Sequence, residues 1–150
     1  MKQGFVKVAS ATPRIRVADP VYNAQVICEQ AKEAAEHGAK IVVFPELCIT
    51  GYTCNDLFLQ ELLLEKAKEA LLTIAEETGQ LETLFLVGLP VDKDGRLYNV
   101  AAVLYRGRIL GMIPKKNIPM YAEFYEGRHF TPGEETVTEY RLGKQVIPFG

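Results

Sequence analysis

The sequence contains no tryptophan, only two histidines and only three cysteines, and the few cysteines exclude two classes of site. Cys28, Cys48 and Cys54 are an odd number and include no C-x-x-C pair, so neither a disulfide framework nor a metal site such as a zinc centre is indicated. No apolar run approaches the roughly 20 residues that span a bilayer, and the first residues lack the long apolar stretch of a signal peptide. We therefore expect a cytoplasmic protein with reduced thiols and no membrane partner.

The chain also lacks an excess of charge of either sign. Its 17 basic and 19 acidic residues give a formal charge of −2, and neither sign forms a long block. A nucleic-acid partner is therefore not expected. With 48% hydrophobic residues among 150, the chain can build the core of one domain, or of a piece of one. The expected partner is a small molecule or another protein.

The first third of the chain has the pattern of a strand, a helix and a second strand. Alternating apolar residues predict a strand over residues 5–9. Asp19-Pro20 provides an N-cap and a proline at the first helical position, and helical spacing continues over 21–35 until His37-Gly38. We interpret His37 as a structural helix cap. The apolar run 40–44 predicts a strand covered on both faces, which completes a crossover unit.

The rest of the chain predicts another long helix followed by mostly short strands. Residues 57–78 are rich in Leu, Ala, Glu and Lys at helical spacing and end at Gly79. Residues 116–131 match neither period and predict a functional loop with one helical turn. The alternation indicates an α/β fold. Further strands are predicted over residues 84–89, 97–105, 108–113, 136–142 and 145–149.

Glu46 is the first candidate for a catalytic residue. It directly follows the apolar strand 40–44, and open α/β sheets bind ligands at the carboxyl ends of their strands. The preceding Pro45 fixes the backbone and favours a defined position. The alternative is a solvated loop residue or a helix-cap acceptor.

Lys115 is the second candidate, because it ends the strand 108–113 beside Lys116. A buried cation at a strand end can stabilise an oxyanion. The alternative is a pair of lysines that keep their ammonium groups in water at the end of a strand.

The loop 119–130 is the third candidate, because it gathers aromatic side chains among charged ones. Tyr121, Phe124 and Tyr125 could form the wall of a binding site or could pin the loop to the core. The nearby Cys48 and Cys54 are expected to be inert buried thiols, since no histidine adjoins them.

Several short motifs, in this order and spacing, resemble the nitrilase superfamily of carbon–nitrogen hydrolases over nearly the whole chain. The string from Tyr121 to Glu126, with Asp56 after Gly51-Tyr52, is more similar to the glutaminase domains of glutamine-dependent NAD synthetases than to aliphatic amidases or carbamoylases. The motifs are Phe44-Pro45-Glu46-Leu47, Gly51-Tyr52, Tyr98-Asn99, Gly111 with Pro114-Lys115, Glu126, and Phe130-Thr131-Pro132-Gly133.

The resemblance implies a four-layer α-β-β-α sandwich, of which residues 1–150 would be the N-terminal portion. It implies a Glu-Lys-Cys triad that hydrolyses the amide of glutamine, with Glu46 as general base and Lys115 as oxyanion stabiliser. Glu126 would be a supporting glutamate, and Tyr121, Phe124 and Tyr52 would bind substrate. The nucleophilic cysteine would come from a later strand, beyond residue 150.

The same resemblance implies partners outside these residues. No cofactor is expected in this domain, while ATP and magnesium would bind a missing C-terminal synthetase domain, and a homo-oligomer is expected. Two alternatives stay open. One is a stand-alone amidase or carbamoylase, and the other is a half-domain without catalytic activity that serves only for assembly.

Overall fold

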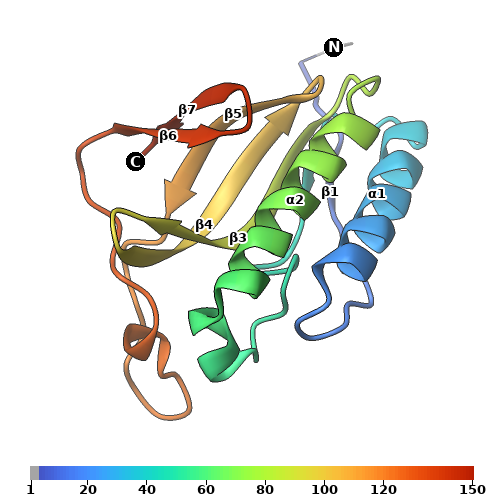
Figure 1. Cartoon of the computed structure of the whole chain (residues 1–150). Coiled ribbons are helices and arrows are strands. Elements are labelled where there is room, and N and C mark those ends of the chain that lie inside the picture. The colour runs from blue at the N-terminus through green and yellow to red at the C-terminus, as the bar shows by residue number, and fades with distance from the viewer. Residues whose placement is uncertain (1–3) are drawn as a thin grey trace.

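The computed structural model describes residues 4–150 and has two helices packed on one face of a seven-stranded sheet (Figure 1). Its helices are α1 (Pro20–Glu36) and α2 (Glu61–Glu77), with 3₁₀ turns η1 (Asn55–Leu59) and η2 (Glu126–Arg128). Its strands are β1 (Val8–Ser10), β2 (Ile41–Val43), β3 (Leu84–Lys93), β4 (Arg96–Tyr105), β5 (Arg108–Pro114), β6 (Thr138–Leu142) and β7 (Gln145–Phe149). Among these residues no helix is both long enough and apolar enough to cross a bilayer.

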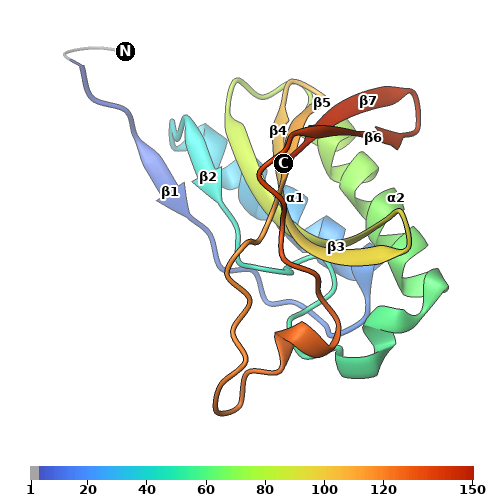
Figure 2. The same ribbon diagram turned by 90° about the vertical axis from the view of Figure 1, so that its left-hand side faces the viewer.

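The sheet has the order β1-β2-β3-β4-β5-β7-β6 and is strongly twisted (Figure 2). β1, β2 and β3 are parallel, which confirms the predicted crossover unit. β3, β4 and β5 form an antiparallel meander, and β7 joins β5 in parallel at Met112 and Phe149. The register places the ends of β2 and β5 beside the middle of β3 and β4, which is where the candidate residues lie.

Helix α1 confirms the sequence prediction. The Asp19 side chain accepts a hydrogen bond from the main-chain N–H of Tyr22 at 3.1 Å, and Pro20 occupies the first turn. At the other end His37 is the C-cap, and its ring Nδ1 lies 2.8 Å from the carbonyl oxygen of Glu33. Gly38 follows with a φ of +81°, a conformation that favours glycine.

The predicted single helix over residues 57–78 is wrong, because Gln60 adopts an extended conformation between η1 and α2. In an unbroken helix, Phe58 and Leu63 would be rotated about 140° from each other and could not both face inward. The break lets Phe58 pack with Leu47 and Phe130 in a small separate core. Packing between distant segments thus overrides the local helical pattern.

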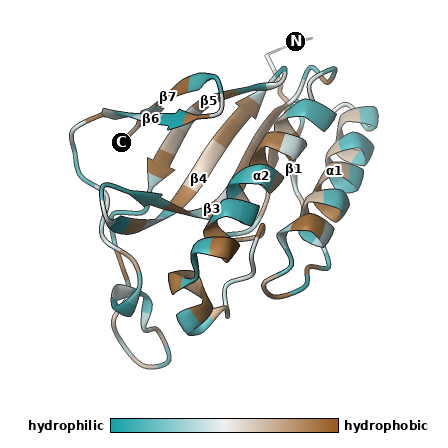
Figure 3. Ribbon diagram, viewed as in Figure 1, coloured by the Kyte–Doolittle hydropathy of each residue, from teal (hydrophilic) through white to brown (hydrophobic). Residues whose placement is uncertain are grey.

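Both helices cover the same face of the sheet, as expected from the family resemblance. The outward turns of α1 and α2 are largely hydrophilic, while β4 and β5 are mostly hydrophobic (Figure 3). The buried core between them includes Ile27 of α1, Leu71 of α2 and Leu89 of β3. The residues of β3 and β4 that face the helices are Phe85, Val87, Leu89, Val91, Tyr98, Val100, Ala102 and Leu104.

The opposite face of the sheet is apolar and uncovered, and we call it the open face. It corrects the prediction that the strand at 40–44 is covered on both faces, because Val43 is 45% exposed while its neighbour Val42 is fully buried. The helices shield only one side of β2. The open face consists of Ile41, Val43, Leu84, Leu86, Gly88, Ala101, Val103 and Ile113.

Several strand boundaries also differ from expectation, and those of β3 and β1 differ most. β3 continues past Pro90 to Lys93, although a strand was predicted only over 84–89. Because β2 pairs with β3 only as far as Leu86, Pro90 lies where β3 has one partner strand, and its missing N–H is tolerated. The first strand begins at Val8 rather than at residue 5.

Candidate active site

A tight turn after β2 positions Glu46. The main-chain N–H of Cys48 donates to the carbonyl of Pro45, and that of Ile49 donates to the carbonyl of Gly88 on β3. Leu47 is fully buried with a φ of +53°, which is uncommon for a residue with a branched side chain. Such backbone conformations persist only where surrounding packing imposes them, and they are concentrated at functional sites.

Gly88 allows this turn to lie directly against β3. A Cβ atom at this position would stand 2.4 Å from the main-chain N of Leu47 and 2.8 Å from the carbonyl oxygen of Pro45. Both neighbours are backbone atoms, so they could not move aside without displacing the turn. Any side chain at position 88 would therefore move Glu46.

Main-chain hydrogen bonds on both sides fix Lys115 at the end of β5. Its N–H donates to the carbonyl of Asn99 on β4 at 2.7 Å, and its carbonyl accepts from Gly133 at 2.9 Å. Gly133 packs against Pro114 so closely that a Cβ would lie 2.7 Å from the Pro114 carbonyl oxygen. The lysine side chain therefore leaves a defined point at the edge of the sheet.

Glu126 reaches the same place from the loop between β5 and β6. It begins η2, and its carbonyl accepts hydrogen bonds from the N–H groups of His129 and Phe130. Phe130 is buried and packs edge-on against Phe58, with ring centroids 5.0 Å apart. This anchor holds the carboxylate of Glu126 in a buried position, 6% exposed.

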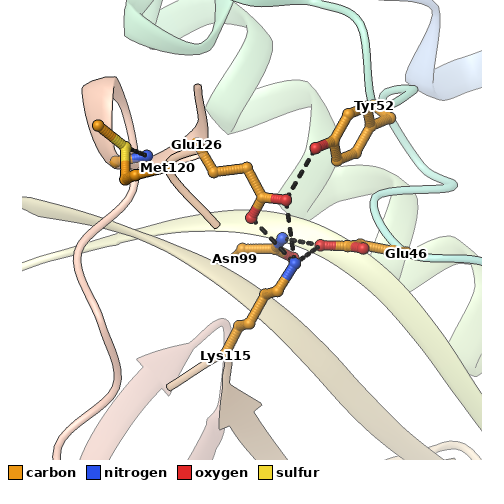
Figure 4. Close-up of polar contacts among 7 residues, drawn as sticks. Glu46, Tyr52, Asn99, Lys115, Met120 and Glu126 are labelled. Atoms are coloured by element: carbon orange, nitrogen blue, oxygen red, sulfur yellow. Dashed lines mark hydrogen bonds and ion pairs between the residues drawn. The ribbon is translucent and has the colours of Figure 1, made fainter. Parts of the chain in front are cut away.

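The ammonium group of Lys115 lies between two carboxylates (Figure 4). Its Nζ is 2.6 Å from Oε1 of Glu46 and 3.0 Å from both carboxylate oxygens of Glu126. The side-chain amide of Asn99 donates to the same Oε1 of Glu46 at 2.5 Å, and the hydroxyl of Tyr52 donates to Glu126 at 2.8 Å. Five side chains from four separated segments thus form one network.

Within this network the pKa values of Lys115 and Tyr52 are both raised above their ordinary values. Burial alone would lower the pKa of Lys115, but its hydrogen bonds to Glu46 and Glu126 outweigh that effect and raise the pKa above its ordinary value. Lys115 is therefore a cation at neutral pH. Burial, with help from the Glu126 carboxylate, raises the pKa of Tyr52 to about 12, so Tyr52 is a neutral donor.

A cavity of about 370 Å³ adjoins this network and opens onto the open face. Its polar lining comes from Glu46, Asn99 and Lys115, and its apolar lining includes Val43 and Ile113. A carboxylate beside a cation at the edge of such a cavity can transfer a proton and stabilise a developing negative charge.

The structure brings together most, but not all, of the residues selected from the sequence. The predicted convergence of Glu46 and Lys115 is confirmed, so Lys115 is not a solvated strand end. Tyr52, predicted to bind substrate, donates a hydrogen bond to Glu126. Tyr121 and Phe124 contact each other with ring centroids 5.5 Å apart and do not line the cavity beside Glu46.

Two residues of the site were not selected from the sequence. Asn99 was noted only as part of a motif, although its side chain contacts Glu46 directly. Gly88 was not noted at all, and a lone glycine in a strand is the sequence signal for close backbone approach.

The thiols of residues 4–150 are not activated. Cys48 is 2% exposed, and burial raises the pKa of its thiol to about 11. Cys54 is also buried, and burial raises its pKa as well, while its Sγ donates to the carbonyl of Thr50. Since the thiolate is the nucleophile, both are poor candidates at neutral pH. Within the described residues no group of three metal-ligating side chains occurs.

The sequence pattern of a family described as carbon-nitrogen hydrolase matches residues 7–147. The chain belongs to this family. Among curated relatives of this carbon–nitrogen hydrolase, the glutamine-dependent NAD(+) synthetase of Mycobacterium tuberculosis is 38% identical over 149 residues, which cover 99% of the chain. The enzyme of the same name from Acinetobacter baylyi is 34% identical over 143 residues, 95% of the chain.

Solved structures agree with the family and the fold. A glutamine-dependent NAD(+) synthetase from Cytophaga hutchinsonii superposes with a TM-score of 0.91 at 29% identity and covers 97% of the chain. An amidase from Nesterenkonia sp. has a TM-score of 0.71 at 24% identity over 95% of the chain and 54% of its own length, which supports the fold alone. The α/β fold is therefore that of nitrilase-superfamily structures.

The chain spans only a part of its relatives. It matches 22% of the M. tuberculosis synthetase, 26% of the A. baylyi one and 25% of the C. hutchinsonii structure.

Proposed function

We propose that this chain is the N-terminal part of a glutaminase domain in a glutamine-dependent NAD synthetase. The observation that carries the proposal is the ion pair of Glu46 and Lys115 at 2.6 Å, beside a cavity, in a carbon–nitrogen hydrolase domain. Relatives named for this activity match nearly the whole chain. The proposed reaction is hydrolysis of the side-chain amide of glutamine, which releases ammonia.

In this reaction each residue has a role that its position supports. A cysteine thiol from outside residues 1–150 gives its proton to Glu46 and attacks the amide carbonyl, and Lys115 stabilises the oxyanion. Glu46 then protonates the departing ammonia, leaving a thioester that water hydrolyses with Glu46 again as base. Glu126 supports Lys115, which it contacts through both oxygens. Tyr121 and Phe124 would contact glutamine from the loop, and Tyr52 would contribute through Glu126.

The remaining parts of the proposal lie outside the chain. The ammonia would be used for ATP-dependent amidation of deamido-NAD by a C-terminal synthetase domain, which would bind ATP and magnesium. A homo-oligomer is part of the same proposal. For the isolated 150 residues we propose no catalytic activity, because neither Cys48 nor Cys54 has the features of a nucleophile.

Substrate preference tests the proposal against a stand-alone amidase or carbamoylase. The full-length gene product that carries this sequence is incubated with glutamine, propionamide or an N-carbamoyl amino acid, and ammonia release is measured. We expect turnover of glutamine, and NAD formation when ATP, magnesium and deamido-NAD are added. Turnover of propionamide or the carbamoyl compound without glutamine turnover would contradict the proposal.

A further inference from the structure

Asn99 connects the two charged residues of the site, although the proposed reaction assigns it no step. It lies on β4 and is 4% exposed. Its side-chain amide donates to Oε1 of Glu46, and its main-chain carbonyl accepts the N–H of Lys115. A displacement of this one residue would alter the positions of both the carboxylate and the ammonium.

The two oxygens of the Glu46 carboxylate have different surroundings. Oε1 accepts from Asn99 at 2.5 Å and from Lys115 at 2.6 Å. Within residues 4–150 no donor bonds to Oε2. The carboxylate therefore has one oxygen engaged by two donors and one oxygen free to accept a proton.

Lys115 is shared between Glu46 and a second carboxylate. Its ammonium group also contacts both oxygens of Glu126, which is buried, whereas the side chain of Glu46 is 42% exposed. Asn99 gives its amide donor to Glu46, and the amide adds no charge to a cluster that already contains two carboxylates and one ammonium. It therefore restricts rotation of the Glu46 carboxylate without competing for the proton.

We propose that Asn99 is the positioning residue of the general base: it holds Oε1 of Glu46 together with Lys115, so that Oε2 is the oxygen that accepts and returns the proton. This role rests on the proposed amide hydrolysis. In that reaction Oε2 takes the proton of the attacking thiol and delivers it to the departing nitrogen, while Oε1 stays hydrogen-bonded throughout.

The test compares Asn99→Ala and Asn99→Asp in the full-length gene product, with kcat and KM for glutamine measured across pH. Asn99→Ala should lower kcat about 10²-fold with little change in KM, since a small misplacement of a catalytic group costs about that much. In Asn99→Asp the introduced carboxylate repels Glu46 at neutral pH. Once protonated it can donate to Oε1, so the kcat ratio of Asn99→Asp to Asn99→Ala should rise as pH falls.

Thr83→Val is the matched control for a purely structural effect. Thr83 is 3% exposed and donates to the carbonyl of Ala39 before the start of β3, away from the candidate site. The control should lose stability, measured by denaturant unfolding, and keep the wild-type pH profile. If Asn99→Ala does not fold, Asn99→Ser takes its place; it should lower kcat relative to wild type, and the kcat ratio of Asn99→Asp to Asn99→Ser should rise as pH falls.

Two results would overturn the role of Asn99 while leaving the proposed function intact. One is an Asn99 variant with wild-type kcat and pH profile, and the other is a kcat ratio of Asn99→Asp to Asn99→Ala that does not change with pH. Wild-type protein that releases no ammonia from glutamine would instead overturn the proposed function, and this role with it.

Discussion

The two faces of the sheet differ in what covers them and in what they carry. On the helix side, Leu89 of β3 is completely buried against α1 and α2. On the open face of the same strand, Leu86 is only partly buried, and Val43 beside it and Ile113 of β5 are exposed. The charged network and its cavity adjoin the open face. The packing that stabilises the fold thus lies on one side of the sheet, and the charged network adjoins the other side.

This difference shows how a carbon–nitrogen hydrolase can hold charged residues next to an apolar sheet. The helix-covered core is mainly apolar, so it can pack densely and fix the strands. Three charges, two negative and one positive, then meet beside the ends of β2 and β5 with hydrogen bonds from Asn99 and Tyr52. Because their partners are in place before any substrate binds, the site is preorganised.

The largest expected effect comes from comparing the two faces of β3 directly. Leu89→Ala should lower the free energy of unfolding of residues 1–150 by about 2–5 kcal/mol, because it leaves a cavity in the covered core. Leu86→Ala, on the open face, should cost roughly 1 kcal/mol, since its side chain is already partly solvated. Urea unfolding measures both, and equal losses would show that the open face is covered.

Alkaline pH should lower the free energy of unfolding through Cys48, a buried thiol of the helix-covered core. Burial raises the pKa of Cys48 from 9.0 to about 11, so between these values the folded protein binds more protons than the unfolded chain. The free energy of unfolding should therefore fall as pH rises from 9 to 11, by up to roughly 2–3 kcal/mol from this residue.

Cys48→Ala isolates that contribution. Its unfolding free energy should decline less steeply over the same pH range, while Cys28, whose pKa is also raised by burial, contributes equally to both proteins. Identical slopes for the variant and the wild type, from urea unfolding at several pH values, would contradict the assignment.

Gly88→Ala tests the close contact between the open face at Gly88 and the turn that carries Glu46. The added methyl group would collide with the turn that carries Glu46, which should cost about 1–3 kcal/mol. The displacement of Glu46, the proposed general base, should also lower glutamine turnover by the full-length product about 10²-fold. Gly111→Ala is the control, since a Cβ there would meet only the Pro148 carbonyl oxygen at 3.8 Å. Equal activity in both variants would argue against the Gly88 contact.

The smallest effect is expected on the outward side of the helices. Lys66 and Glu69 of α2 pair at 2.6 Å, but their side chains are 44% and 62% exposed. Lys66→Ala should change the free energy of unfolding by less than about 0.5 kcal/mol, because water and salt screen such pairs. A larger loss in thermal or urea unfolding would mean that this surface is not simply solvated.

The sequence was sufficient where the structure depends on near neighbours. The cap at Asp19, the periodicity of α1 and the bounds of β7 are local patterns, and the structure contains them. The sequence was insufficient where contacts with a residue far along the chain determine the local structure. Gln60 interrupts the second helix because Phe58 packs against Phe130, more than seventy residues later.

The site shows the same division. Glu46 and Lys115 were selected from their strand ends and from the family resemblance, and their meeting across 69 residues is confirmed. The contact of Asn99 with Glu46 and the close approach at Gly88 depend on strand register, which periodicity does not give. Tyr52 was assigned to substrate from the family resemblance, and its hydrogen bond to Glu126, 74 residues later, also depends on the fold.

Ammonia release from glutamine by matched lysine variants tests the central claim most directly. In the full-length gene product, Lys115→Met should lower kcat by about 10³-fold, because the oxyanion loses its cation, while the exposed neighbour Lys116→Met should stay within a few-fold of wild type. Residues 1–150 alone should release no ammonia. Wild-type turnover by Lys115→Met, or turnover by residues 1–150 that a Cys48→Ala, Cys54→Ala double variant abolishes, would contradict the account.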